Sequence, residues 1–155
     1  MRQQGLHRLN SISVGKNRPD YIVMHFLISD LMSAISKYAT GRLLDVGCGN
    51  KPYESLFGKS VSSYVGCDVV QSDLNKVDVI CEATQLKFED SSCDTVFSTQ
   101  VIEHVSNPFR MSEEMFRVLK SGGHLILSAP FAWELHEEPY DFFRYSKHGL
   151  KAMFE

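Results

Sequence analysis

The chain has 155 residues, 43% of them hydrophobic and 23% charged, which suits one globular domain with a core of ordinary size. A formal net charge of -3 gives no electrostatic reason to expect a nucleic-acid or membrane surface. Charged residues or glycines interrupt every apolar stretch, and the amino terminus lacks the apolar segment of a secretory signal. These features predict a cytoplasmic protein with no nucleic-acid or membrane partner.

Helical and strand-like segments alternate along most of the chain. Residues 1–18 are polar and aperiodic, which predicts a flexible lead, or alternatively a loosely docked cap, before a domain spanning 19–155. Pro19 is expected to open a first helix and Gly41 to end it, because apolar residues recur between them at helical spacing. Five strands are predicted, at 42–46, 63–68, 77–81, 95–99 and 124–129. Two further helices are predicted at 53–57 and 108–119, and Gly122 and Gly123 are expected to end the second of them.

This alternation predicts an α/β fold, a doubly wound parallel sheet covered by helices on both faces. In such sheets the ligand lies beyond the carboxyl ends of the strands. The turns after the five predicted strands are therefore the places where a binding site is expected, at residues 45–50, 68–70, 81–85, 99–105 and 129–145.

The first of these turns reads LLDVGCGNKP and has glycines at positions 47 and 49. Glycines there let a ligand approach the backbone closely. The dinucleotide fingerprint requires a third glycine, but that position holds Pro52. Asp45 would repel a pyrophosphate, whereas a ligand with a positive amino or sulfonium group would be attracted to it. The alternative is that Asp45 only caps the turn.

A second acid ends the next strand. Asp68 follows Gly49 by 19 residues, the spacing expected for a carboxylate that binds ribose hydroxyls. An ordinary turn acid is the alternative.

The segments LLDVGCGNKP, VGCD, CEATQLKFEDSSCDTVFSTQVIEHV and VLKSGGHLILSAP occur in this order. Together they resemble the successive motifs of class I S-adenosylmethionine-dependent methyltransferases. Glu82 stands where aspartate is common and Lys87 where proline is common. The resemblance implies S-adenosyl-L-methionine as cofactor and S-adenosyl-L-homocysteine as product. The residues that it places around the cofactor are Asp45, Gly47, Cys48, Gly49, Asp68, Val69, Glu82, Ala83, Thr84 and Gln100.

Catalytic residues are harder to predict, because methyl transfer from a sulfonium depends mainly on positioning. His104, just past the fourth strand, is a candidate general base. Its pair with Glu103 resembles an acid–histidine pair of ubiquinone-pathway O-methyltransferases, where it can belong to a metal site. A structural role and an acceptor-side role are the other interpretations, and no metal site is predicted.

The second candidate region is the segment 130–150, rich in aromatic and charged residues. Its position after the fifth strand suits an acceptor pocket, and a lid or dimer contact is the alternative. Asp141 is predicted to be catalytic, and His136, Arg144 and Tyr145 to bind substrate.

The chain has four cysteines, at positions 48, 67, 81 and 93. None forms a C-x-x-C pair, which disfavours zinc binding and a disulfide framework, so reduced thiols are expected.

The resemblance also implies a seven-stranded sheet, of which this chain lacks the last two strands. We expect either a fragment of a longer protein or a homodimer that covers the open sheet edge. The predicted function is methyl transfer to a small-molecule or glycan-type acceptor by in-line displacement. The alternative is an inactive module that binds the cofactor; a nicotinamide-dependent dehydrogenase fits the fold but not Asp45 or Pro52.

Overall fold

The structure is a computed structural model that describes residues 8–12, 15–17 and 19–154. Its centre is a five-stranded parallel sheet with the strand order β3-β2-β1-β4-β5. This order confirms the doubly wound α/β fold predicted from the sequence. The strands are β1 (Gly41–Val46), β2 (Val61–Asp68), β3 (Val79–Ile80), β4 (Cys93–Thr99) and β5 (Leu119–Ser128).

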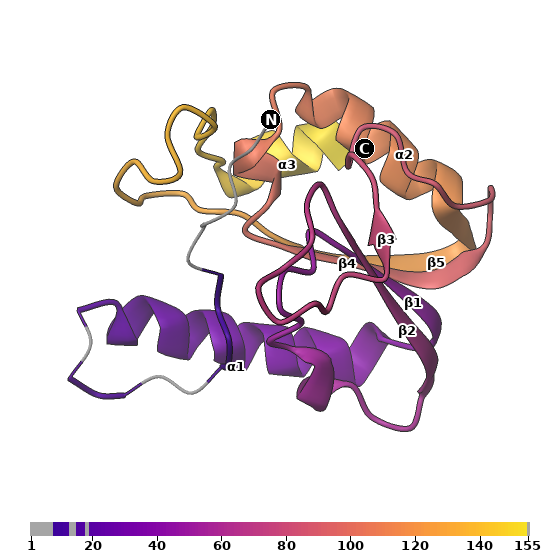
Figure 1. Ribbon diagram of the computed structural model, residues 1–155, viewed down its shortest axis with the longest axis horizontal. Coiled ribbons are helices and arrows are strands. Elements are labelled where there is room, and N and C mark those ends of the chain that lie inside the picture. Colours follow the sequence, from indigo (N-terminus) through magenta and orange to yellow (C-terminus); the bar gives the residue numbers. More distant parts are fainter. Residues whose placement is uncertain (1–7, 13–14, 18, 155) are drawn as a thin grey trace.

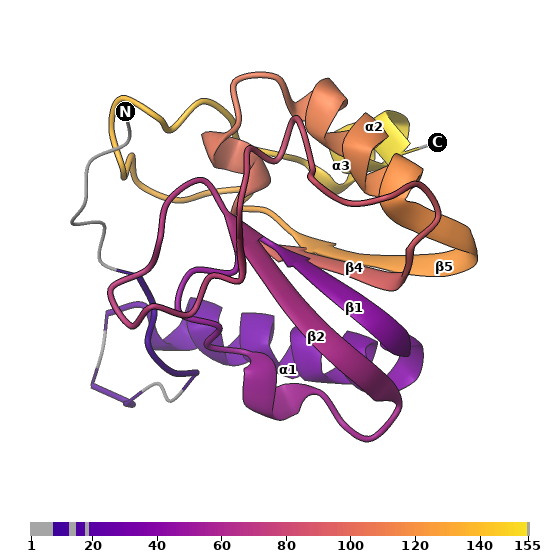
Figure 2. The ribbon, with the colours of Figure 1, turned by 45° about the vertical axis from the view of Figure 1, so that its right-hand side comes forward.

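Helices cover both faces of the sheet (Figures 1 and 2). α1 (Tyr21–Tyr38) lies on one face, and α2 (Pro108–Val118) and α3 (Lys147–Phe154) lie on the other. Two short 3-10 turns, η1 (Glu54–Leu56) and η2 (Ile102–His104), follow β1 and β4. Among the described residues, no helix is both long and apolar enough to cross a membrane.

The core consists of two apolar layers separated by the sheet. Successive side chains of a strand point to opposite faces, so Leu43 packs in the α1 layer and Leu44 in the α2 layer. The α1 layer also contains Phe97 and Ile35, and Met111 belongs to the α2 layer. Burial on both faces explains why these strands are almost uniformly apolar in sequence.

Several predicted boundaries were wrong. The first helix begins at Tyr21 rather than Pro19, and the segment 53–57 forms only a 3-10 turn. The third strand is limited to two residues. α2 ends at Val118, where the carbonyls of Arg117 and Val118 accept hydrogen bonds from the N–H groups of residues 91 and 92. β5 therefore begins before the two glycines that were expected to end the helix.

Candidate functional site

Two adjoining cavities lie at the carboxyl ends of the strands, where the loop 130–146 projects beyond the sheet (Figure 1). Their volumes are about 630 Å³ for the first cavity and about 950 Å³ for the second, within the range of small-molecule sites. Both cavities are lined by Gly47, Asp68, Val101 and His104, so these four residues mark where they meet. A ligand longer than either cavity could therefore extend from one into the other.

The turn after β1 is shaped by its two glycines. Gly47 has φ of +78° and Gly49 has φ of +50°, both in the left-handed region that favours glycine. A Cβ on Gly47 would lie 2.4 Å from a methyl carbon of Val101, so a larger residue does not fit. The N–H groups of Gly47 and Cys48 donate to the carbonyl of Cys67 at 2.8 and 3.0 Å, which fixes the turn against β2.

Asp45 is buried at the base of the first cavity. Its side chain accepts a hydrogen bond from the Tyr64 hydroxyl. Burial raises the pKa of Asp45 to about 7; the Tyr64 hydrogen bond opposes this rise and the nearby charge of Asp68 adds to it. The carboxyl group is thus held near the midpoint of its titration at neutral pH, so a cationic ligand group beside it would favour its ionised form.

Asp68 lies where the two cavities meet and is almost fully buried. Its carboxylate accepts hydrogen bonds from the Gly49 N–H at 3.1 Å and the Val69 N–H at 2.7 Å. The guanidinium group of Arg8 binds both of its oxygens, through a 3.0 Å hydrogen bond and a second, shorter contact. The residue predicted to bind ribose is thus engaged by the amino-terminal segment.

The structure brings the ten predicted cofactor residues to the walls of these cavities. Those on the first cavity are Asp45, Gly47, Cys48, Gly49, Asp68 and Gln100. Those on the second cavity are Gly47, Asp68, Val69, Glu82, Ala83 and Thr84. Gln100 has a positive φ of +54°, and its N–H donates to the Ser128 carbonyl at 3.0 Å, which links the ends of β4 and β5.

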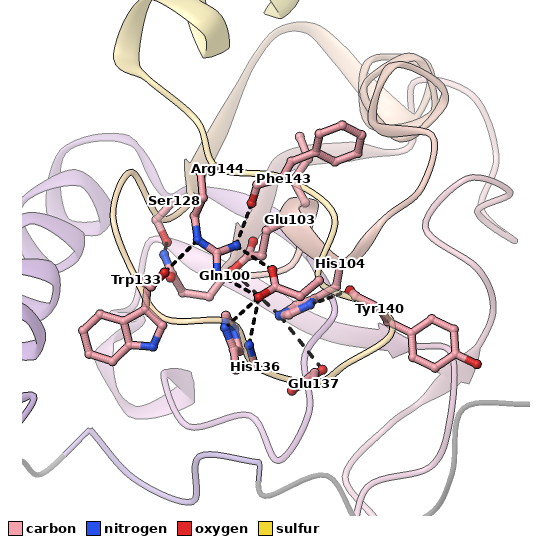
Figure 3. Close-up of polar contacts among 12 residues, drawn as sticks. Gln100, Glu103, His104, Ser128, Trp133, His136, Glu137, Tyr140, Phe143 and Arg144 are labelled. Carbon is pink, nitrogen blue, oxygen red and sulfur yellow. Dashed lines mark hydrogen bonds and ion pairs between the residues drawn. The ribbon is translucent and has the colours of Figure 1, made fainter.

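His104 ends η2 and is buried between the cavities. Its Nδ1 lies 2.8 Å from the backbone carbonyl of Tyr140, which can only accept, so Nδ1 carries the proton. In the neutral ring the lone pair is then on Nε2. This atom lies 4.0 Å from carboxylate oxygens of both Glu103 and Glu137 (Figure 3).

The sequence pointed to Glu103 only as the acidic neighbour of His104. Its side chain is fully buried, and neither carboxylate oxygen has a hydrogen-bond partner among the described residues. Burial raises the pKa of Glu103 to about 7. An unsatisfied buried carboxyl is costly, and such groups in folded proteins call for an explanation.

The loop 130–146 contributes one predicted substrate residue to the first cavity, His136. Asp141 accepts hydrogen bonds from the His136 backbone N–H at 2.9 Å and from Arg144 at 2.5 and 2.7 Å, and Arg144 holds the pKa of Asp141 well below its ordinary value. Tyr145 is buried, and its hydroxyl donates to the Ile102 carbonyl. Asp141, Arg144 and Tyr145 line neither cavity. Their hydrogen bonds instead fix the conformation of the loop.

Sequence reasoning missed Arg8, Tyr64 and Val101. Tyr64 points to the same face as Asp45 only once β1 and β2 are paired, and Val101 lies behind the first turn through the fold. Arg8 had no local signal, since its partner is 60 residues away. A motif search cannot find such contacts, because the three residues reach the site through tertiary packing.

Comparison with known proteins places the chain in a family. The profile described as "Methyltransferase domain" matches residues 44–127, more than half of the chain. A protein of Mycolicibacterium gilvum named as an uncharacterized methyltransferase is 33% identical over 114 residues, which is 66% of this chain and 45% of that protein. The chain thus spans less than half the length of this relative.

Solved structures share the fold at lower identity. The YcgJ protein of Bacillus subtilis has a TM-score of 0.69 at 22% identity, with 84% of this chain and 66% of that chain covered. The [4+2]-cyclase SpnF has a TM-score of 0.66 at 20% identity, with 97% of this chain and 62% of that chain covered. The fold and the profile match agree, and the chain belongs to the methyltransferase domain family.

Proposed function

We propose that the protein binds S-adenosyl-L-methionine across the two cavities and transfers its methyl group to a small-molecule or glycan-type acceptor. The observation that carries this proposal is the distribution of the ten predicted cofactor residues over two cavities that meet at Gly47 and Asp68. The adenosine would occupy the second cavity and the amino-acid end the first. The sulfonium would then lie near their junction.

Each end of the cofactor has a matching group. Asp68 at the junction suits two ribose hydroxyls, once Arg8 releases its carboxylate. Asp45 suits the positive amino group of the amino-acid end, and the glycine turn leaves room for that end to contact the backbone. The two ends of the cofactor would thus meet different groups: the neutral, hydroxyl-bearing ribose would bind at Asp68, and the charged amino-acid end would bind beside Asp45.

The acceptor would enter the remaining part of the first cavity. Phe131 and Trp133 supply apolar walls there, and His136 a polar group, which suits a small polar acceptor. The methyl carbon would be attacked in line with its bond to sulfur, and the sulfide would leave as S-adenosyl-L-homocysteine. If the acceptor is a hydroxyl group, His104 Nε2 would accept its proton. Asp141 would then act by positioning His136 rather than by touching the acceptor.

Calorimetric titration with S-adenosyl-L-homocysteine tests cofactor binding. The parent chain should bind it, and Asp68→Ala should bind at least about tenfold more weakly, since each hydrogen bond to a charged group contributes ~1.5–3 kcal/mol. Asp73→Ala, which removes an exposed acid outside both cavities, should bind like the parent. No heat from the parent at millimolar ligand would refute cofactor binding, and an unchanged affinity of Asp68→Ala would refute the role given to that carboxylate.

A cofactor-binding module without turnover is the second candidate. It is favoured by the contact of Arg8 with the proposed ribose carboxylate, which occupies the group that the cofactor would need. An acceptor screen that measures formation of S-adenosyl-L-homocysteine separates the two candidates. Turnover that His104→Ala slows would support the enzyme, whereas tight binding with no product across the screen would support the module.

A further inference from the structure

We propose that Glu103, His104 and His136 form a binding site for a divalent transition-metal ion. Within the described part of the chain, one group of histidine, cysteine and acidic side chains has the geometry to hold an ion, and it is this one. One potential ligand atom from each residue lies within 4.8 Å of the others. Figure 3 shows the side chains of His104 and His136 turned toward each other, with Glu103 above them.

The three potential ligand atoms would have to move only slightly closer together to bind an ion. A tetrahedral ion with ligand bonds of ~2.0–2.2 Å holds its ligand atoms ~3.4 Å apart, so this trio would draw in by at most ~1.5 Å. Two of the ligands follow β4 on the buried turn η2. The third comes from the loop 130–146, which an ion would tie to the end of β4.

The buried carboxylate of Glu103 is the observation that points to a cation. Within the part of the chain that the structure describes, both of its oxygens lack hydrogen-bond partners, and its side chain is 0% exposed. Burying such a group without compensation is unfavourable, and an ion bound to it would supply the missing partner. Two further carboxyl groups lie beside the histidines. A Glu137 oxygen is 4.0 Å from His104 Nε2. Asp141 Oδ2 is 3.3 Å from His136 Nδ1 and pairs with Arg144. A cation at this site would interact favourably with these acidic neighbours.

The surroundings of the two histidines match those of metal ligands. A metal-bound imidazole usually donates its other N–H to a carbonyl or carboxylate. His104 Nδ1 has such a partner in the Tyr140 carbonyl at 2.8 Å. His136 Nδ1 lies 3.1 Å from the Glu134 carbonyl and 3.3 Å from Asp141 Oδ2. Asp141 in turn is held by Arg144. Both rings are thus oriented by groups that only accept hydrogen bonds.

Two imidazoles and one carboxylate favour zinc or another first-row divalent ion over magnesium or calcium, which prefer oxygen ligands. Three protein ligands leave a coordination position open, as in catalytic rather than structural sites. Because His104 and His136 line the first cavity, that position would face the proposed acceptor space. An ion bound at His104 Nε2 would occupy the lone pair of that atom, so His104 would act as the proton acceptor proposed above only while the metal site is empty. The site goes beyond the proposed methyl transfer, and its detection needs neither cofactor nor acceptor.

Titration of the full chain with cobalt(II) chloride, after removal of metals with a chelator, tests the proposal. One equivalent of cobalt should produce the visible absorption bands of a four- or five-coordinate ion with nitrogen and oxygen ligands. Calorimetry with zinc chloride should give one site. His136→Ala and Glu103→Gln should each weaken binding by more than about tenfold. His148→Ala and Glu113→Gln, which alter exposed residues of α3 and α2, should bind like the parent.

Circular dichroism should confirm that every variant is folded; if Glu103→Gln is not, the half-buried His136→Ala decides. Absence of cobalt bands in the parent would overturn the proposal. Equal affinity of His136→Ala and the parent would also overturn it. Intense near-ultraviolet thiolate-to-cobalt absorption would place the ion instead at Cys67 and Cys81, which both line the second cavity.

Discussion

Asp45 illustrates how a single side chain can be costly to the fold and useful to the site. It is 2% exposed, yet it carries an ionisable group near the end of β1, where an asparagine would fit the same space. Its pKa of about 7 results mainly from burial, with the Tyr64 hydroxyl as its hydrogen-bond donor. A fully ionised carboxylate would be less stable here unless a cationic ligand accompanied it.

Asp45→Asn should therefore change how stability depends on pH. The unfolded chain ionises this carboxyl near its ordinary pKa of 3.8, whereas the folded chain keeps the proton up to about pH 7. The folded state binds more protons in this interval, so the free energy of unfolding should fall as pH rises from 4 to 7, by up to about 4 kcal/mol. In Asp45→Asn this part of the decline should be absent.

Thermal unfolding at a series of pH values measures the effect. The exposed Asp73→Asn serves as the matched control and should follow the parent curve. If the curves of the parent and Asp45→Asn decline in parallel, the carboxyl group is not held neutral by burial.

At the scale of elements, the segment 8–12 acts as a strap over the turn after β1. Leu9 and Ile12 pack against the α1 layer of the core, and Asn10 accepts a 2.6 Å hydrogen bond from Asn50. These contacts place the Arg8 guanidinium against Asp68, beside Gly49. A ribose bound at Asp68 would have to displace it, so the strap and the proposed cofactor compete for one carboxylate.

Arg8→Ala should consequently tighten binding of S-adenosyl-L-homocysteine. Releasing a hydrogen-bonded ion pair costs ~1.5–3 kcal/mol, which corresponds to about tenfold or more in affinity. Arg8→Lys keeps the charge but loses the two-pronged contact, and should give an intermediate value. Calorimetry on the three proteins measures the series. Weaker binding by Arg8→Ala would show that Arg8 holds the ligand rather than blocking it.

Some elements of this fold could be predicted from the sequence, and others could not. The sheet and the first turn were predictable, because burial on both faces leaves apolar runs and the turn needs glycines at positions 47 and 49. The end of α2 was not, since it depends on N–H groups from residues 91 and 92. The contacts of Arg8 with Asp68 and of His136 with His104 join distant segments, so no local pattern encodes them.

On the scale of the whole molecule, the two sheet edges differ. β3 ends the sheet on one side with two residues, whereas β5 ends it on the other with ten. Within the described residues no strand lies beyond β5, so its outer backbone groups form a long edge that could pair with another strand. We propose that, when this 155-residue chain is prepared alone, a second copy covers this edge.

Sedimentation velocity over a concentration series should then show a monomer–dimer equilibrium. Hydrogen exchange measured across the same series should slow at the amides of β5 as the dimer forms, because outward N–H groups gain partners there. The amides of β3, on the opposite edge, provide an internal control and should exchange at the same rate throughout. A single monomeric species at all concentrations would refute the dimer. Protection confined to β3 would place the contact on the opposite edge, because only the strand that is paired in the dimer gains hydrogen bonds.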